Sequence, residues 1–285
     1  MNSLIIDTHQ HLIYPGRGAY SWTQGLDALE GKSFPVEEYR RLAQPAGILG
    51  SIFMETSPDD WRAELAHIVQ LAAQPDSEIV GIVANCRPEE DGFEQYIESI
   101  RTEKLVGLRR SCHTEPDDLS RQPQFVQNVR RAGRAGLTFD LCFLARQLDI
   151  ALELARRCPD TQFVLDHCGV PDIAGGIMDS WCAAIRDLAG LPNVACKISG
   201  VLAYCSAENA TMQAVRPWVE HCIESFGWDR VVWGSDWPVC NIRSSLPAWI
   251  DISQQIVQSA SEDEQAKFFH KNALRLYRVR VTQSR

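Results

Sequence analysis

The sequence Asp7-Thr8-His9-Gln10-His11 follows a short apolar run, Leu4-Ile5-Ile6, near the start of the chain. The run predicts a first β-strand. Because successive side chains of a strand alternate between its faces, His9 and His11 should point the same way, together with Asp7. Two imidazoles so placed at a strand end can share a metal ion or polarise a carbonyl group. Two histidines can also fall together in a loop by chance, so partners at other strand ends decide between these interpretations.

Strand-like and helix-like segments alternate along the whole chain, in eight units and with no change of composition that would mark a linker. This alternation predicts parallel strands joined by helical crossovers, and eight units in 285 residues favour a (β/α)₈ TIM barrel with one domain, 1–285. An open doubly wound sheet is the alternative, but it normally has a glycine-rich turn where this chain has His9-Gln10-His11. After the first, the expected strands are 47–54, 79–84, 105–109, 137–143, 163–167, 194–198 and 230–236.

Composition excludes several other classes of protein. The formal net charge of −9, without a basic stripe, argues against nucleic-acid binding. No apolar run approaches the ~18 residues of a membrane span, and no signal peptide is evident. The ten cysteines lack C-x-x-C spacing and several lie in apolar runs, which is typical of free thiols in a reducing cytoplasm. We expect a cytoplasmic enzyme and leave open whether it is a homo-oligomer.

The segment 12–35 between the first strand and the first helix is unusually long and rich in Gly, Tyr and Trp. Connections of this length are usually functional or disordered. Its aromatic residues Tyr14, Tyr20 and Trp22 favour an ordered lid over the barrel, although they could equally serve as packing.

Four expected strands end in polar residues that would be costly to bury unless they were paired or functional. Besides the first strand, they carry Asp166-His167, Lys197 and Asp236, and catalytic residues of a TIM barrel lie at such strand ends. The fourth expected strand adds Arg109 and Arg110, of which alternation lets only one face inward. Three imidazoles and one carboxylate match a mononuclear zinc site with room for water. We interpret three further histidines, in helical segments, as structural: His67, His221 and His270.

Five motifs occur in the order of a known superfamily. They are Ile6-Asp7-Thr8-His9-Gln10-His11, Gly107-Leu108-Arg109, Phe163-Val164-Leu165-Asp166-His167-Cys168-Gly169, Cys196-Lys197-Ile198-Ser199-Gly200 and Gly234-Ser235-Asp236-Trp237-Pro238-Val239-Cys240. With Asn272-Ala273-Leu274-Arg275-Leu276-Tyr277 they extend over nearly the whole chain. The chain thus resembles the amidohydrolase superfamily, in particular the aldonolactonase-like branch of fuconolactonases, rhamnonolactonases and pyrone-dicarboxylate lactonases. The resemblance implies a distorted TIM barrel that opens a lactone ring by hydrolysis.

Two departures from the superfamily limit what it implies. Binuclear members bridge their metals with a carbamylated lysine on the fourth or fifth strand, and no lysine stands there in this chain, so one metal ion is the most we expect. Relatives often continue the sixth-strand motif as Gly-Lys-Pro, whereas this chain has Gly169-Val170-Pro171. A substrate contact made by that lysine would be absent, which leaves the sugar open.

The resemblance suggests a role for each residue. Asp236 would act as the general base toward water, and His9, His11 and His167 would polarise the lactone carbonyl, either through one zinc ion bound with Asp236 or by direct hydrogen bonds. Arg109 and Lys197 would stabilise negative charge or hold the substrate. Four aromatic residues would stack on a sugar ring: Tyr14, Tyr20, Trp22 and Trp237.

Three alternatives to sugar-lactone hydrolysis, and so to a role in carbohydrate catabolism, remain at this stage. The same residues serve decarboxylases of unsaturated or aromatic acids, and lactonases that act on pyrone- or muconolactone-type substrates. A barrel that binds a sugar acid without turnover is the third. The complete set of His9, His11, His167 and Asp236 argues against the last, because a binding module gains little from keeping both a ligand cluster and a base.

Overall fold

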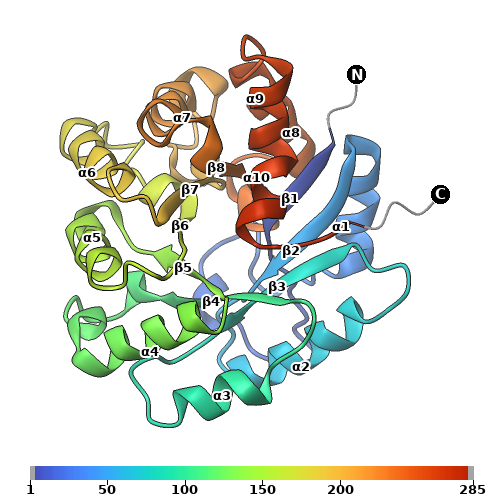
Figure 1. Cartoon of the computed structure of the whole chain (residues 1–285). Coiled ribbons are helices and arrows are strands. Elements are labelled where there is room, and N and C mark those ends of the chain that lie inside the picture. The colour runs from blue at the N-terminus through green and yellow to red at the C-terminus, as the bar shows by residue number, and fades with distance from the viewer. Residues whose placement is uncertain (1–3, 282–285) are drawn as a thin grey trace.

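The computed structural model describes residues 4–281. Eight parallel strands, in the order β1 to β8, curve into a nearly closed barrel surrounded by helices (Figure 1). The end of β1 and the segment that follows β8 meet through backbone hydrogen bonds of 2.8 Å, from Asp236 N–H to the His9 carbonyl and from His11 N–H to the Trp237 carbonyl. This confirms the single-domain TIM barrel. The strands are β1 (Ile5–Gln10), β2 (Ile48–Met54), β3 (Ile79–Asn85), β4 (Leu105–Ser111), β5 (Thr138–Cys142), β6 (Phe163–Leu165), β7 (Val194–Ile198) and β8 (Val231–Trp233).

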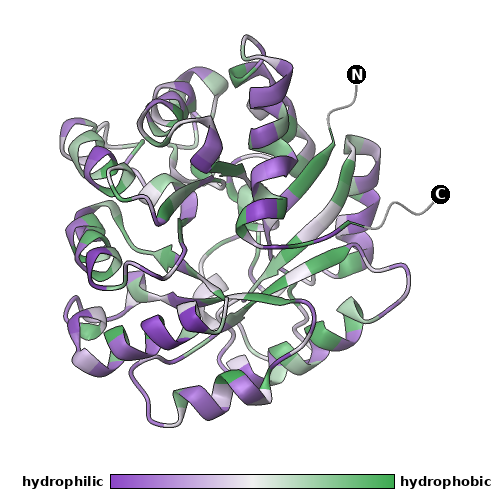
Figure 2. Cartoon of the chain, in the orientation of Figure 1, coloured by the Kyte–Doolittle hydropathy of each residue, from purple (hydrophilic) through white to green (hydrophobic). Residues whose placement is uncertain are grey.

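The helices form the outer layer and turn their apolar faces toward the strands (Figure 2). In α5, for example, the buried positions Leu148, Ala151, Leu154 and Ala155 recur at the three- and four-residue spacing of one helix face. None of the helices within residues 4–281 combines the length and apolarity that a membrane crossing requires. The helices are α1 (Val36–Ala43), α2 (Trp61–Ala72), α3 (Phe93–Ser99), α4 (Pro123–Arg134), α5 (Leu148–Arg157), α6 (Asp179–Ala189), α7 (Met212–Phe226), α8 (Leu246–Ile256), α9 (Glu262–Ala266) and α10 (Asn272–Leu276).

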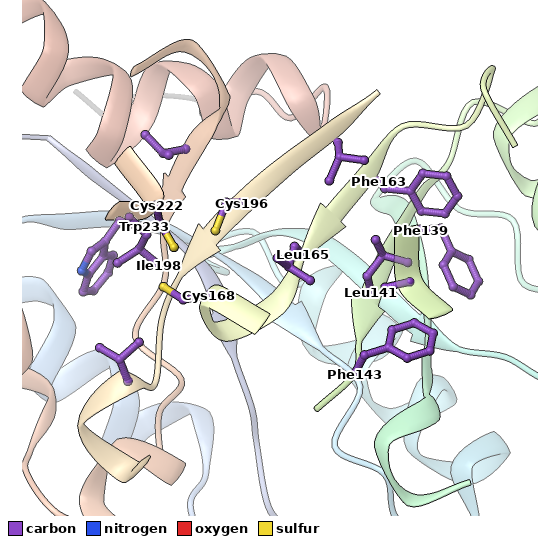
Figure 3. Packing of buried hydrophobic residues seen from close by; sticks show 14 of the residues in the cluster. Phe139, Leu141, Phe143, Phe163, Leu165, Cys168, Cys196, Ile198, Cys222 and Trp233 are labelled. Carbon is purple, nitrogen blue, oxygen red and sulfur yellow. The ribbon is translucent and has the colours of Figure 1, made fainter. Parts of the chain in front are cut away.

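The buried apolar side chains form two clusters, one on each side of the barrel wall. The larger lies between strands and helices, where Phe139 and Phe163 of adjacent strands pack edge to face (Figure 3). The smaller fills the barrel interior with side chains such as Ile6, Val164 and Val232, together with Tyr277 just after α10. The lower barrel is therefore packed mainly with apolar side chains, and the Tyr277 hydroxyl at this level donates to the buried Asp140 carboxylate in the middle of β5 (2.9 Å).

The strand ends that carry the site depart from regular strand geometry. β6 and β8 are shorter than expected, so Asp166, His167 and Asp236 lie just beyond them rather than within them. His167 and Asp236 have φ values of 54° and 56°, a left-handed conformation that costs a non-glycine residue roughly 1–2 kcal/mol. Such strained conformations cluster at functional sites, and here both residues are buried just beyond the ends of their strands.

A β-bulge in β1 also changes the expected arrangement of its side chains. The register against β2 shifts between Asp7 and Gln10, so that Ile6 and His9 both lie inside the barrel although strict alternation would separate them. The carboxylate of Asp7 instead accepts hydrogen bonds from the Tyr39 hydroxyl of α1 (2.7 Å) and the Ser235 N–H (2.8 Å). The prediction that Asp7 shares the face of His9 is therefore wrong.

Candidate active site

A cavity of about 460 Å³ opens at the carboxyl ends of the strands. The residues that border it include His11, Arg109, His167 and Asp236, contributed by four different strand ends. This is the end of the barrel at which TIM-barrel enzymes carry their active sites. The cavity is the candidate active site of the protein.

The carboxylate of Asp236 lies among three imidazoles at the base of this cavity. Its Oδ1 is 3.4 Å from His11 Nε2 and 3.6 Å from His9 Nε2, and its Oδ2 is 3.7 Å from His167 Nδ1. His9 and His11 approach each other to 3.1 Å through their Nε2 atoms, so the histidines do share one face. Gly200 makes room for the carboxylate, because a Cβ atom there would stand 2.2 Å from Asp236 Oδ2.

Burial keeps two of these imidazoles in the neutral form. It lowers the pKa of His167 and takes the pKa of His9 well below its ordinary value. His11 Nδ1 lies 2.9 Å from the Met54 carbonyl, which can only accept, so the Nδ1 proton is donated there and the Nε2 lone pair faces the site. His167 Nδ1 lies 2.9 Å from the Ser199 hydroxyl. Neutral imidazoles held by neighbours are what both metal ligation and proton transfer require.

A fully buried charge network supports His9 from below. The Lys197 ammonium donates to Asp140 (2.5 Å) and Asp166 (2.8 Å) and lies 3.3 Å from His9 Nδ1. Burial opposes the charge of Lys197, but these two carboxylates raise its pKa above the ordinary value. Burial raises the pKa of Asp140 to about 7. Burial also opposes the charge of Asp166, but the attraction of Lys197 together with the contacts to His9 and His167 outweighs it, and the pKa of Asp166 falls well below normal.

The two arginines of β4 have different surroundings. Arg109 donates to the Glu55 carboxylate (2.6 Å) and reaches His9 and Asp166 at 3.4 and 3.5 Å. Arg110 pairs with Glu89 and Glu115. Both border the cavity, but only Arg109 extends to the imidazole cluster.

Not every expected substrate-binding residue reaches the cavity. Trp22 borders it and donates from Nε1 to the Thr56 carbonyl (2.8 Å). Within the segment 12–35, the Tyr14 hydroxyl accepts from the Val36 N–H and the Tyr20 hydroxyl from the Tyr14 N–H, and neither ring borders the cavity in the described structure.

Two further expected residues, Lys197 and Trp237, are completely buried and do not border the cavity either. The Trp237 ring packs against Phe34 and Tyr39.

The cavity also includes polar residues that the sequence interpretation passed over. Asn85 is the last residue of β3 and Arg87 follows it, and His113 follows β4, with a pKa that burial lowers to about 4. Glu55, which directly follows β2, anchors Arg109. Each stands at or just after the end of an apolar strand, which is the same signal that singled out His167 and Asp236.

The donor atoms of His9, His11 and Asp236 fit a metal ion. Ligand atoms of a tetrahedral zinc ion with bonds of ~2.0–2.1 Å lie ~3.3 Å apart, and the three separations here are 3.1, 3.4 and 3.6 Å. His167 does not join this group of three and instead clusters with His9 and Asp166. The metal set expected from sequence is thus brought together for three of its four members.

Comparison with known proteins agrees with this architecture. The sequence model of the Amidohydrolase family matches residues 6–279. The chain belongs to this family. It is 28% identical to an L-fucono-1,5-lactonase of Burkholderia ambifaria, over 96% of this chain and 95% of that protein. It is 33% identical to a 4-sulfomuconolactone hydrolase of Rhizobium radiobacter, over 81% and 75%.

The fold of this amidohydrolase is also that of a solved relative. A Burkholderia multivorans amidohydrolase, crystallised with bound zinc, superposes with a TM-score of 0.91 at 24% identity, over 98% of this chain and all of the other. The likeness confirms the barrel.

Proposed function

We propose that this amidohydrolase opens the ring of a lactone by hydrolysis, with a sugar lactone as the first candidate substrate. The observation that carries the proposal is the Asp236 carboxylate, held 3.4–3.7 Å from three imidazole nitrogens at the base of a cavity large enough for a small ring. The relatives named as lactonases support the choice of an ester ring as the bond to be broken.

Asp236 is suited to move the proton of the attacking water. As water adds to the lactone carbonyl carbon, the carboxylate takes its proton, and when the ring carbon–oxygen bond breaks, the same proton passes to the departing alkoxide. Arg109, kept charged by Glu55, stands beside His9 where negative charge would build up on the carbonyl oxygen.

The site can take two forms, which differ in the ring nitrogen of His9 that carries the proton. The ammonium of Lys197 can only donate, so when it bonds to His9 Nδ1 the single proton of the neutral imidazole must lie on Nε2. In that form the Nε2 proton of His9 is donated to His11 Nε2, 3.1 Å away, so His9, which is completely buried and does not border the cavity, acts on the substrate through His11 and Asp236. To bind a metal, His9 would instead turn its Nδ1 proton toward Asp166, 3.5 Å away.

If one divalent metal such as zinc is bound, His9, His11 and Asp236 would hold it, and it would polarise the carbonyl as a Lewis acid. The zinc bound by the Burkholderia multivorans amidohydrolase supports this form. The role of Asp236 as proton acceptor and the placement of Arg109 apply whichever form is active.

A second class of substrate, a lactone that carries an acidic group, is favoured by Arg87. This half-buried guanidinium borders the cavity. It contacts Asn85 Oδ1, the Cys86 carbonyl and the face of the Trp61 ring, and it has no carboxylate partner in the described part of the chain. Arg109 and Arg110 are both neutralised by glutamates. A carboxylate or sulfonate on the substrate would supply the missing partner.

The test is a pH-indicator assay on purified protein with neutral aldonolactones, carboxylated pyrones and muconolactones. Stoichiometric acid release that is lost in Asp236→Asn supports lactone hydrolysis, and a preference for acidic rings that disappears in Arg87→Gln assigns the second class. Failure to release acid from any of these rings, or release of carbon dioxide from unsaturated acids instead, would refute the proposal.

A further inference from the structure

Three cysteines meet on the outer side of the barrel wall, away from the cavity. Cys168 follows His167 in the turn after β6, Cys196 lies on β7 and Cys222 on α7. Their sulfur atoms all lie within 4.8 Å of one another, and all three residues are completely buried. In Figure 3 the sulfurs converge from three separate elements, beside Ile198 and Trp233.

The cluster is a set of soft donors in apolar surroundings. No histidine or carboxylate of residues 4–281 completes the group to four donors. The nearby Lys197 contributes only its backbone carbonyl, 3.9 Å from Cys168 Sγ, since its ammonium is engaged inside the barrel.

Donor number and charge decide which species fits. Structural zinc takes four ligands, and a zinc or copper(I) ion on three thiolates would leave a net negative charge, which is costly in a dry interior without a cation. A trivalent metalloid on three thiolates is neutral. We propose that Cys168, Cys196 and Cys222 form a binding site for a trivalent, thiophilic metalloid such as arsenic(III).

The binding step balances without any change of oxidation state. Arsenous acid, As(OH)₃, exchanges its three As–O bonds for three As–S bonds, and the three thiol protons leave with the hydroxide groups as three molecules of water. The product joins the turn of His167 to β7 and α7. The site therefore lies one residue from the candidate active site without sharing a residue with it.

The experiment incubates the reduced full-length protein with arsenite and measures the bound arsenic by native mass spectrometry and X-ray absorption. We expect one arsenic per chain with three sulfur neighbours. Cys222→Ala should abolish tight binding, and Cys222→Ser, which keeps the side-chain volume, should do the same. Cys158→Ala removes a buried cysteine outside the cluster and should bind as the wild type does.

Circular dichroism of each variant establishes that it is folded. Absence of bound arsenic in the wild type would overturn the proposal, as would arsenic with only two sulfur neighbours. Undiminished binding in a folded Cys222→Ala protein would place the metalloid at other thiols and would equally overturn it.

Discussion

Replacement of Lys197 by methionine tests how much the buried charge network beneath the site contributes to stability. Methionine fills most of the space of the lysine stem but lacks the ammonium that lies 2.5 Å from Asp140 and 2.8 Å from Asp166. All three side chains are completely buried, so water cannot replace the lost partner. The variant therefore leaves two carboxylates without their common cation.

The expected cost follows from the charges that remain. Removal of one partner of a buried ion pair costs about 3–5 kcal/mol. Asp140, with a pKa of about 7, can take up a proton, and Asp166 keeps a weaker contact with Arg109 at 3.5 Å. We therefore expect Lys197→Met to lower the free energy of unfolding by an amount at the lower end of this range, about 3 kcal/mol. The double variant Lys197→Met/Asp140→Asn should lose less stability, because it also removes one of the two carboxylates that no longer have a cation.

Urea denaturation at pH 7, followed by tryptophan fluorescence, measures the free energy of unfolding of each variant. Lys267→Met is the matched control, because Lys267 is a more exposed lysine that also bridges two aspartates, Asp229 and Asp263, and its loss should change stability far less. A loss below about 1 kcal/mol for Lys197→Met, or one equal to that of Lys267→Met, would refute the reasoning. Normal stability with impaired lactone binding would instead support the substrate-contact role expected from sequence.

Three further predictions concern the base, the metal and a buried acid. Asp236→Asn should lower kcat for the substrate by about 10²–10⁴-fold, and near wild-type turnover in steady-state assays would remove its role as base. Chelation should abolish activity, with recovery on adding zinc, if His9, His11 and Asp236 hold a required metal; equal activity of metal-free protein, verified by elemental analysis, would assign the hydrogen-bonding form. Burial raises the pKa of Glu64 to about 8, so the folded protein binds this proton more tightly than the unfolded chain and loses stability as pH rises from about 4.5 to 8. Glu64→Gln should flatten that part of the Tm–pH curve, and an unchanged slope would contradict the shift.

The repetition of strand and helix in the sequence determined the fold class, because each unit needs the next to bury its apolar face. The same logic singled out His9, His11, His167 and Asp236, since polar residues at the ends of buried strands are too costly to keep without a partner or a use. Glu55 and His113 also stand at or just after the ends of strands, but the sequence alone does not show which polar strand ends come together in one site.

Only the tertiary structure decided which of these side chains meet and which face water. The bulge in β1 and the left-handed residues His167 and Asp236 redirect side chains in a way that strict alternation does not anticipate. The sequence pattern predicts Lys197 as a site residue, yet it lies under His9 with its charge paired to Asp140 and Asp166. The physical reason is that spacing along a chain sets only the local direction of a side chain, whereas its partners come from strands far away in sequence that barrel closure brings within hydrogen-bonding distance.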